Sequence, residues 1–355
     1  AITDFFCGGG GARTFADGVD TGGIFHSMAS KLANAETVES RVPVLQVYRR
    51  QLPDAGGPGR FRGGVTVEFA SVPHKMPIRP GGLNTVGSGV ALPAGRGLAG
   101  GAPGAASRNF VLRGSNLMDL FAAGRVPATS EELECREVDV LAAKSFTLID
   151  EGDVLIGSIG NGSGYGDPLR RDPELVARDV REGLVSEALA AGVYGVVMRD
   201  GKVDGKATEA ARSAIRAERL AEATPQDGGS GGTTTGGTVA GGTVTGGMVT
   251  GGMVMGGTVL HPVGDTVEAV EHDGERSLRC TVCGYRFGPY DHDHKRSAVM
   301  RELPLTAISP HNALCLPEIV LREFYCPGCG TAIAVDVQRS GDEILDETRL
   351  EAPAP

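Results

Sequence analysis

The feature that most constrains this chain is a pair of Cys-x-x-Cys motifs, each followed directly by glycine. The motif residues are Cys280, Cys283 and Gly284 in the first and Cys326, Cys329 and Gly330 in the second. Two intervening residues let both thiolates of a motif turn toward one cation, and two such turns form the closed four-sulfur tetrahedron of structural zinc. The sequence therefore predicts a small zinc-ribbon β domain that holds one Zn2+, with iron or unmetallated thiols as the alternatives.

The other cysteines and two nearby histidines are weaker signals. Seven cysteines are an odd set, poorly suited to a disulfide framework, and a thioredoxin-like redox role uses a single Cys-x-x-Cys at the start of a helix. Cys315, in the apolar stretch NALCLPEIV, is expected to be a small buried residue. His292 and His294 are expected in a solvated polar loop, with a second metal site as the alternative.

Charge and hydropathy argue against two classes of partner. The formal net charge is −10, and the stretches EAVEHDGE and SGDEILDETRLE beside the cysteine motifs are acidic, so they would repel a phosphate backbone. No apolar run approaches the roughly 18 residues of a membrane span, and the first residues show neither a basic leader nor an apolar signal core. We therefore expect a cytoplasmic protein that binds neither nucleic acid nor a membrane. Ala1 either follows a trimmed methionine or begins a downstream piece of a longer polypeptide.

Composition divides the 355 residues into three blocks. Residues 1–222 alternate short β-type runs with glycine turns and end in helical patterns, of which the clearest has Asp172 as N-cap and Pro173 at its first position. Residues 223–260 contain a pentapeptide repeat, GGTVA to GGTVL, which predicts a flexible tether, with an ordered strip docked on a partner as the alternative. Residues 261–355 hold both cysteine motifs. The predicted fold class is α+β: a β-rich, glycine-turn-rich domain ending in helices, a glycine-rich linker and a zinc-ribbon domain.

Two glycine-rich stretches stand out in the first block. DAGGPGRFRGG, residues 54–64, places Arg60 and Arg62 among five glycines. Either another backbone approaches these glycines closely while an arginine pairs with an acidic group, or the amides and arginines form an anion cradle; the composition favours the first. The second stretch, GSIGNGSGYGDPLRRDPELV, lacks the GK[ST] ending of a phosphate loop, so Tyr165 and Asp167 are expected to lock a turn.

Together these stretches resemble one family. GGPGRFRGG preceded by VPVLQVYRRQL, and GYGDPLRRDPELVARDVREGLVS followed by VYGVV, are similar to the hydantoinase B family, which includes the large α-subunits of acetone and acetophenone carboxylases. The resemblance spans about residues 7–220 and covers only the C-terminal part of such subunits. The third block, through CTVCG and VLREFYCPGCGTAIAVDV, resembles the zinc-containing γ-subunit of acetone carboxylase, a mark of ketone carboxylases.

The resemblance implies a role in a multisubunit enzyme. This enzyme is a biotin-independent, ATP-dependent ketone carboxylase, a ligase that forms a β-keto acid from a ketone and bicarbonate. The implied partners are a hydantoinase A-like subunit, which binds ATP/Mg2+, and the N-terminal part of the α-type subunit, which holds Mn2+. The isolated chain is then expected to be inactive. The alternatives are a subunit of an ATP-dependent hydantoinase or 5-oxoprolinase, which hydrolyses a cyclic amide, and a non-catalytic assembly module.

No spacing is diagnostic of catalytic residues. The stretch DGVDTGGIFHSMASKLANAETVESR carries Asp20 and four weak candidates for holding a metal or bicarbonate or for abstracting a proton α to a carbonyl, namely His26, Asn34, Glu36 and Glu39. The resemblance places the last three in an Asn/Glu-containing stretch of the family. A set of turn and interface hydrogen bonds is the competing interpretation, and the spacing favours it.

Overall fold

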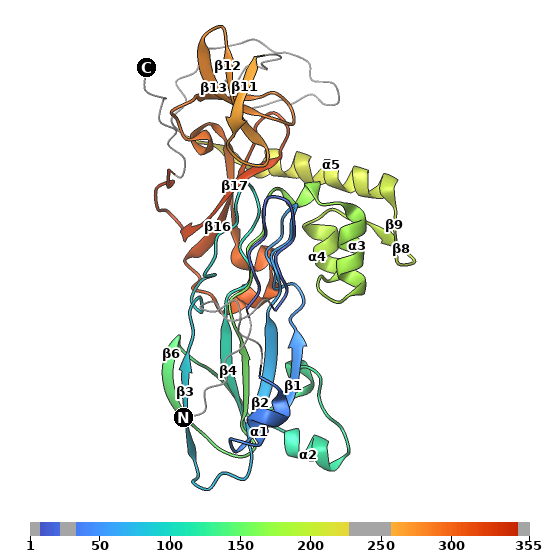
Figure 1. Cartoon of the computed structure of the whole chain (residues 1–355), viewed down its shortest axis with the longest axis vertical. Coiled ribbons are helices and arrows are strands. Elements are labelled where there is room, and N and C mark those ends of the chain that lie inside the picture. The colour runs from blue at the N-terminus through green and yellow to red at the C-terminus, as the bar shows by residue number, and fades with distance from the viewer. Residues whose placement is uncertain (1–7, 22–32, 227–256, 347–355) are drawn as a thin grey trace.

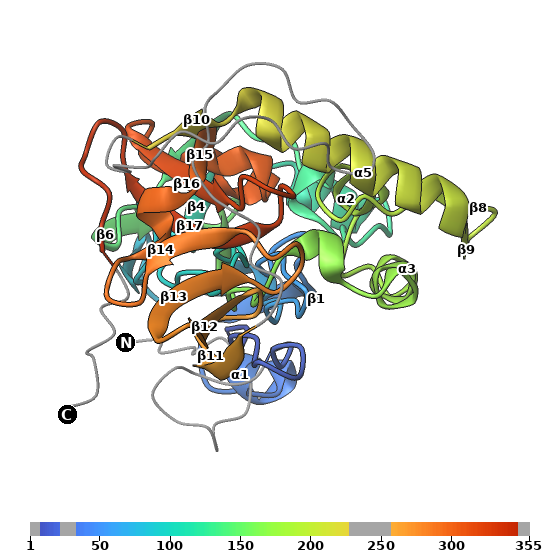
Figure 2. The same ribbon diagram turned by 90° about the horizontal axis from the view of Figure 1, so that it is seen from above.

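The structure is a computed structural model that describes residues 8–21, 33–226 and 257–346. It is strand-rich with some helices, which confirms the predicted class. Figure 1 shows the strands β1, β2 and β4 toward one end of the molecule, the strands β11, β12 and β13 at the other, and the helices α3, α4 and α5 to one side. Figure 2, seen from above, shows α5 extending away from the C-terminal strands.

An antiparallel sheet of five strands, in the order β1-β2-β7-β4-β5, organises the first block. Its strands are β1 (Val44–Gln51), β2 (Val67–Pro73), β4 (Arg108–Arg113), β5 (Glu137–Val140) and β7 (Val154–Ser158). One face packs on α2 (Leu117–Ala122) through Leu112 and Ile156, and the opposite face packs on the ribbon of β3 (Gly81–Val86) and β6 (Lys144–Ile149) through Val111. The central strands β2 and β7 are buried along nearly their whole length, which explains why their sequences are rich in apolar residues.

Helices follow where the period of the sequence changes. The main ones are α3 (Pro173–Arg181), α4 (Glu187–Gly192) and α5 (Gly205–Glu222), with the shorter α1 (Ala35–Glu39) and the 3-10 turns η1 (Ser130–Glu132) and η2 (Pro168–Arg170) earlier in the chain. Asp172 caps α3 as predicted, because its side chain accepts a hydrogen bond of 3.0 Å from the Glu174 amide. A small hairpin of β8 (Met198–Arg199) and β9 (Lys202–Val203) precedes α5. In the described ranges, no helix combines the length and apolar character of a membrane crossing.

Two four-stranded antiparallel sheets form the C-terminal part. One contains β11 (Thr258–Pro262), β12 (Val267–His272), β13 (Glu275–Cys280) and β14 (Arg286–Pro289). The other contains β10 (Thr224–Pro225), β15 (Val299–Pro304), β16 (Ile319–Tyr325) and β17 (Ala332–Arg339), and the connections include η3 (His294–Ser297), η4 (Leu305–Ala307) and η5 (Pro310–Leu314). Leu278, Phe287 and Phe324 belong to the core that the two sheets share.

The predicted linker coincides with strands at both of its ends. Residues 224–225 form β10, which follows α5 and pairs with β15, and residues 258–260 begin β11, which pairs with β12. Most of the pentapeptide repeat, residues 227–256, lies outside the described residues. The boundaries after residues 222 and 260 therefore stay predictions, and strand pairing begins inside them.

A bundle of segments mostly outside helices and strands connects the two ends. We call it the glycine bundle; its segments are residues 8–12, 16–20, 55–64, 97–106 and 160–166. The Gly64 amide donates to Gly10 O at 2.8 Å, and the Gly162 amide donates to Gly64 O at 3.0 Å. A Cβ added to Gly63 would lie 1.9 Å from Gly162 O, so a larger residue would push the two backbones apart.

Candidate metal centre and the contacts around it

Each Cys-x-x-Cys motif closes a tight turn at the end of a strand. Cys280 ends β13 and Cys326 follows β16. The Gly284 amide donates to Cys280 O at 2.9 Å, and the Gly330 amide donates to Cys326 O at the same distance. The two glycines have φ angles of +76° and +68°, a conformation that glycine adopts without a steric cost. Glycine thus follows each motif because the turn requires its backbone freedom.

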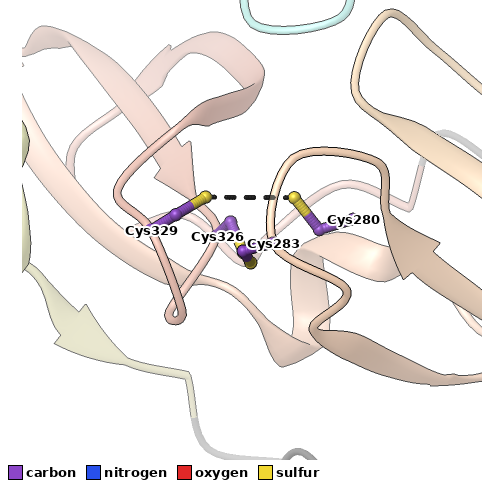
Figure 3. A group of neighbouring side chains, drawn as sticks. All are labelled: Cys280, Cys283, Cys326 and Cys329. Atoms are coloured by element: carbon purple, nitrogen blue, oxygen red, sulfur yellow. Dashed lines mark hydrogen bonds between the residues drawn. The ribbon is translucent and has the colours of Figure 1, made fainter. Parts of the chain in front are cut away.

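The two turns bring all four cysteine side chains together (Figure 3). Their sulfurs all lie within 4.8 Å of one another; the Cys280 and Cys329 sulfurs are 3.9 Å apart and the Cys283 and Cys326 sulfurs 3.6 Å apart. Zinc–sulfur bonds of about 2.3 Å in a tetrahedron place the sulfurs about 3.8 Å from one another. The geometry therefore fits a four-coordinate ion held only by thiolates. In the described part of the chain, no other cluster of His, Cys, Asp and Glu has metal-site geometry.

The electrostatics of this cluster also call for a cation. Hydrogen bonding with the Cys280 thiol raises the pKa of Cys326 and of Cys283, whereas it lowers the pKa of Cys329. The four thiols therefore do not ionise together on their own, because each thiolate opposes the next. A divalent cation at the centre reverses that repulsion and favours the deprotonated forms. Such a closed set of four thiolates is consistent with zinc, and iron is the alternative ion for four sulfur ligands.

The two histidines of YDHDHKR lie in different environments. The His292 side chain is 66% exposed beside Asp291, as predicted for a solvated loop. His294 is buried and its ring packs against Phe287, so the prediction of a solvated side chain is wrong for this residue. Asp293 accepts a hydrogen bond from the Lys295 amide at 2.8 Å and starts the 3-10 turn η3, which directs His294 inward. Burial lowers the pKa of His294.

Cys315 lies in a partly buried position against the core around Leu321 and Val335. Burial raises the pKa of its thiol to about 11. The prediction of a small apolar packing residue agrees with this environment.

Both arginines of DAGGPGRFRGG pair with carboxylates. Arg60 Nη1 lies 2.7 Å from Asp265 Oδ1, and Arg62 Nη1 lies 2.9 Å from Asp20 Oδ1. The Arg62 side chain is 3% exposed; burial by itself would lower its pKa, but the hydrogen bond to Asp20 and the charge of Asp179 raise it. The close backbone approach and the pairing that the composition favoured are thus both present. An anion-binding role for these arginines stays a prediction.

The weak catalytic candidates make local hydrogen bonds where they are described. Asn34 caps α1 by accepting from the Glu36 amide at 2.9 Å, and Glu39 accepts from the Gln46 amide at 2.7 Å. The Glu36 side chain is exposed, and His26 lies outside the described residues. Asp20 accepts hydrogen bonds from the Arg62 side chain and from the Val65 amide. A catalytic role for His26, Asn34, Glu36 or Glu39 stays a prediction.

Asp167 locks its turn as predicted and also contacts the C-terminal part. It accepts from the Leu169 amide at 3.0 Å at the start of η2. Its carboxylate also accepts from Arg219 at 3.1 Å and from the Ala332 amide at 3.0 Å. Sequence reasoning missed Arg219, because an arginine on a polar helix has no local feature that marks it as buried. Asp265, beside a glycine in a turn, is equally unmarked.

Comparisons with known proteins match this two-part construction. Residues 1–168 match the family Hydantoinase B/oxoprolinase, and residues 254–354 match the family Acetone carboxylase gamma subunit. The chain thus joins a segment that matches the first family model, named here the hydantoinase B region, to a segment that matches the second, named here the gamma region. Both resemblances seen in the sequence are thereby confirmed. We use these two names below for residues 1–168 and 254–354.

Relatives of this chain include subunits of two carboxylases and of a caprolactamase. The acetone carboxylase alpha subunit of Xanthobacter autotrophicus is 30% identical over 63% of this chain and 31% of its own length. The acetophenone carboxylase delta subunit of Aromatoleum aromaticum is 29% identical over 53% of this chain and 28% of its own length. The caprolactamase subunit beta of Pseudomonas jessenii is 32% identical over 58% of this chain and 32% of its own length. A nucleotide-free structure of acetone carboxylase superposes with a TM-score of 0.56 at 29% identity, over 62% of this chain and 31% of that one. The chain thus spans about a third of the length of the relatives it matches.

Proposed function

We propose that this chain is a component of a biotin-independent, ATP-dependent ketone carboxylase, which forms a β-keto acid from a ketone and bicarbonate. The observation that carries the proposal is the gamma region, which shares one chain with a hydantoinase B region. Hydantoinase B relatives include a caprolactamase subunit as well as carboxylase subunits, so that region alone leaves the reaction open. The gamma region is named for acetone carboxylase and favours carboxylation.

We assign Zn2+ to Cys280, Cys283, Cys326 and Cys329. Such an ion has all four positions filled by protein sulfur, so it supplies folding energy to the C-terminal strands and takes no part in substrate chemistry. The cytoplasm is the proposed location, since a reducing compartment keeps these thiols available for metal.

The remaining parts of the reaction belong to partners in this proposal. A hydantoinase A-like subunit binds ATP/Mg2+, and the N-terminal part of an α-type subunit holds Mn2+, as the family resemblance implies. This chain then contributes the glycine bundle and the metal centre to the assembled enzyme. The proposal expects no turnover from the chain alone.

The test is ATP hydrolysis by the complex reconstituted from this chain, a hydantoinase A-like subunit and the missing α-type part. Acetone or acetophenone with bicarbonate should stimulate hydrolysis and yield the β-keto acid, whereas the same mixture without this chain should not respond. If a lactam, a hydantoin or 5-oxoproline stimulates hydrolysis and the ketone does not, the carboxylase proposal is wrong. The result would then support the second candidate function, cyclic-amide hydrolysis, which the caprolactamase relative favours. Full ketone-stimulated turnover without this chain would reduce it to an assembly module.

A further inference from the structure

One turn near the end of the hydantoinase B region is connected to both cysteine motifs of the gamma region through one or two intervening residues. We call it the GYGDPLR turn, residues 164–170. Its backbone belongs to the glycine bundle on one side, because the Tyr165 amide donates to Phe61 O at 3.0 Å and the Gly164 amide donates to Ala102 O at 2.8 Å. On the other side, two of its side chains, Asp167 and Arg170, contact residues of the gamma region.

The second motif is connected to Asp167 by Arg219. Arg219 Nη1 donates to both carboxylate oxygens of Asp167 at 3.1 Å and to Gly330 O, which closes the motif, at 3.2 Å. The same guanidinium lies 4.9 Å from the ring centre of Tyr325, the residue before Cys326. Asp167 is fully buried and Arg219 is 4% exposed, so neither charge has water as a substitute partner.

The first motif is connected to the other end of the turn by Asp265. Its two carboxylate oxygens accept from Arg60 at 2.7 Å and from Arg170 at 2.5 Å. The next residue, Thr266, accepts through its carbonyl from the amide of Thr281, which lies between the two cysteines of the motif, at 3.0 Å. Arg219 alone therefore lies between the second motif and the turn, and the adjacent residues Asp265 and Thr266 lie between the first motif and the turn.

The backbones at these contacts leave little room for adjustment. A Cβ on Gly330 would lie 2.8 Å from Arg216 O of α5, and a Cβ on Gly100 of the glycine bundle would lie 2.3 Å from Ala332 O. A Cβ on Gly166 would lie 2.9 Å from Asp265 Oδ2. Movement of a cysteine motif therefore displaces the turn, because packed backbones do not absorb it locally.

We propose that the metal centre and the GYGDPLR turn are energetically coupled, and that Arg219 is the positioning residue that couples them. A bound ion fixes the conformation of the second motif, hence Gly330 O and the Ala332 amide, and these hold Arg219 and Asp167 in register. Loss of the ion releases Gly330 O, and the buried pair then shifts with it. The proposal rests on the zinc assignment made above, and it places the centre where it sets the conformation of the GYGDPLR turn, at the end of the hydantoinase B region.

The test uses the full chain and compares Arg219→Lys with a matched control, Arg286→Lys. Lysine keeps the charge of Arg219, but its side chain ends one atom short of Nη1, the atom that donates to both Asp167 and Gly330 O. Arg286, in β14, pairs at 3.1 Å with the exposed Glu275 of β13. This pair lies near the first motif but is not among the contacts between the motifs and the turn. Metal release to a chromogenic chelator should be about tenfold faster in Arg219→Lys, the usual effect of removing an outer contact of a metal ligand. The control should release metal at the wild-type rate, and equal release by all three proteins would overturn the proposal.

Hydrogen exchange of the Leu169 amide gives the second readout, because this amide donates to Asp167. In the wild type, removal of the metal should speed its exchange while amides of β2 stay protected. In Arg219→Lys it should exchange fast even with metal bound and respond little to removal. A Leu169 amide that ignores metal removal in the wild type refutes the coupling alone. A wild-type chain purified without any bound metal refutes the zinc assignment and the coupling together.

Discussion

Arg60 and Asp265, 205 positions apart in the chain, are joined by a hydrogen bond of 2.7 Å. The Asp265 side chain is 6% exposed, and its second oxygen takes Arg170 at 2.5 Å. One carboxylate of the gamma region thus holds two arginines, Arg60 of the stretch DAGGPGRFRGG and Arg170 at the end of the GYGDPLR turn. The stretch DAGGPGRFRGG therefore contacts the gamma region at Asp265.

Replacing Asp265 by Ala should lower the free energy of unfolding of the full chain by about 1–3 kcal/mol, since two arginines lose their carboxylate. Arg60 is 40% exposed, so solvent screening keeps the loss toward the lower figure. Glu271→Ala is the control, because Glu271 pairs with Arg276 at the surface; its effect should stay within about 0.5 kcal/mol. Urea unfolding measures both, and an Asp265→Ala protein as stable as the control would show that the two ion pairs contribute nothing to stability.

Gly63→Ala should disrupt the glycine bundle, because its Cβ would lie 1.9 Å from Gly162 O and the clash is with backbone. We expect either no soluble protein or a loss above about 4 kcal/mol. Gly205→Ala at the start of α5 meets nothing within 4 Å and should be neutral or stabilising by about 0.4–1 kcal/mol. Soluble yield and thermal unfolding separate the two. A well-folded Gly63→Ala protein would show that the bundle tolerates separation of its backbones.

Cys283→Ser should abolish metal binding, whereas Cys315→Ala should keep one ion per chain. The first removes one of four clustered sulfurs and the second removes a thiol in an apolar setting. We expect the strands β11 to β17 to lose protection from proteolysis in Cys283→Ser, while the sheet of β1 and β2 stays resistant. Elemental analysis of fresh protein measures the ion. Substoichiometric metal in the wild type would count against the assignment.

His311 should make the protein acid-sensitive. Burial, followed by the charge of Arg108, lowers its pKa below 6.5, although Glu68, Asp54 and the Pro53 carbonyl act in the opposite sense. The unfolded chain then binds the proton more readily, so the stability that neutral His311 contributes is complete above 6.5 and falls as the pH drops below it. His311→Gln keeps a donor for Pro53 O, 2.7 Å from Nε2 in the wild type, and should show a smaller fall in melting temperature between about pH 7.5 and 5.5. Identical falls in both proteins would refute this.

Tyr194→Phe should leave stability unchanged or raise it by up to about 1 kcal/mol. Tyr194 is fully buried, burial raises its pKa to about 12, and its hydroxyl has no hydrogen-bond partner in the described part of the chain. Tyr48→Phe provides the contrast, because the Tyr48 hydroxyl donates to the buried Glu68 at 3.1 Å and its loss should cost about 1 kcal/mol. Destabilisation by Tyr194→Phe would contradict this prediction.

Local patterns predicted the parts of the fold that depend on near neighbours. Asp172 and Pro173 marked the start of α3 because capping involves only the next few amides. Glycine after each cysteine pair marked a turn because the positive φ of Gly284 and Gly330 is a property of single residues. The burial of His294 was missed, since a run of charged residues says nothing about which side of a turn faces the core.

The sequence by itself determined the donor set of the metal centre, the strand and helix types and the two family resemblances, because each is encoded within a few residues or a short motif. Tertiary structure alone decided which distant segments meet. The glycine-rich composition predicted that backbones approach closely, but it did not show that Gly63 faces Gly162. Likewise, the pairing of Arg60 with Asp265 and of Asp167 with Arg219 depends on how sheets and helices pack. Charge complementarity permits many such pairs, and only the packed backbone selects among them, because burial makes every unpaired charge costly.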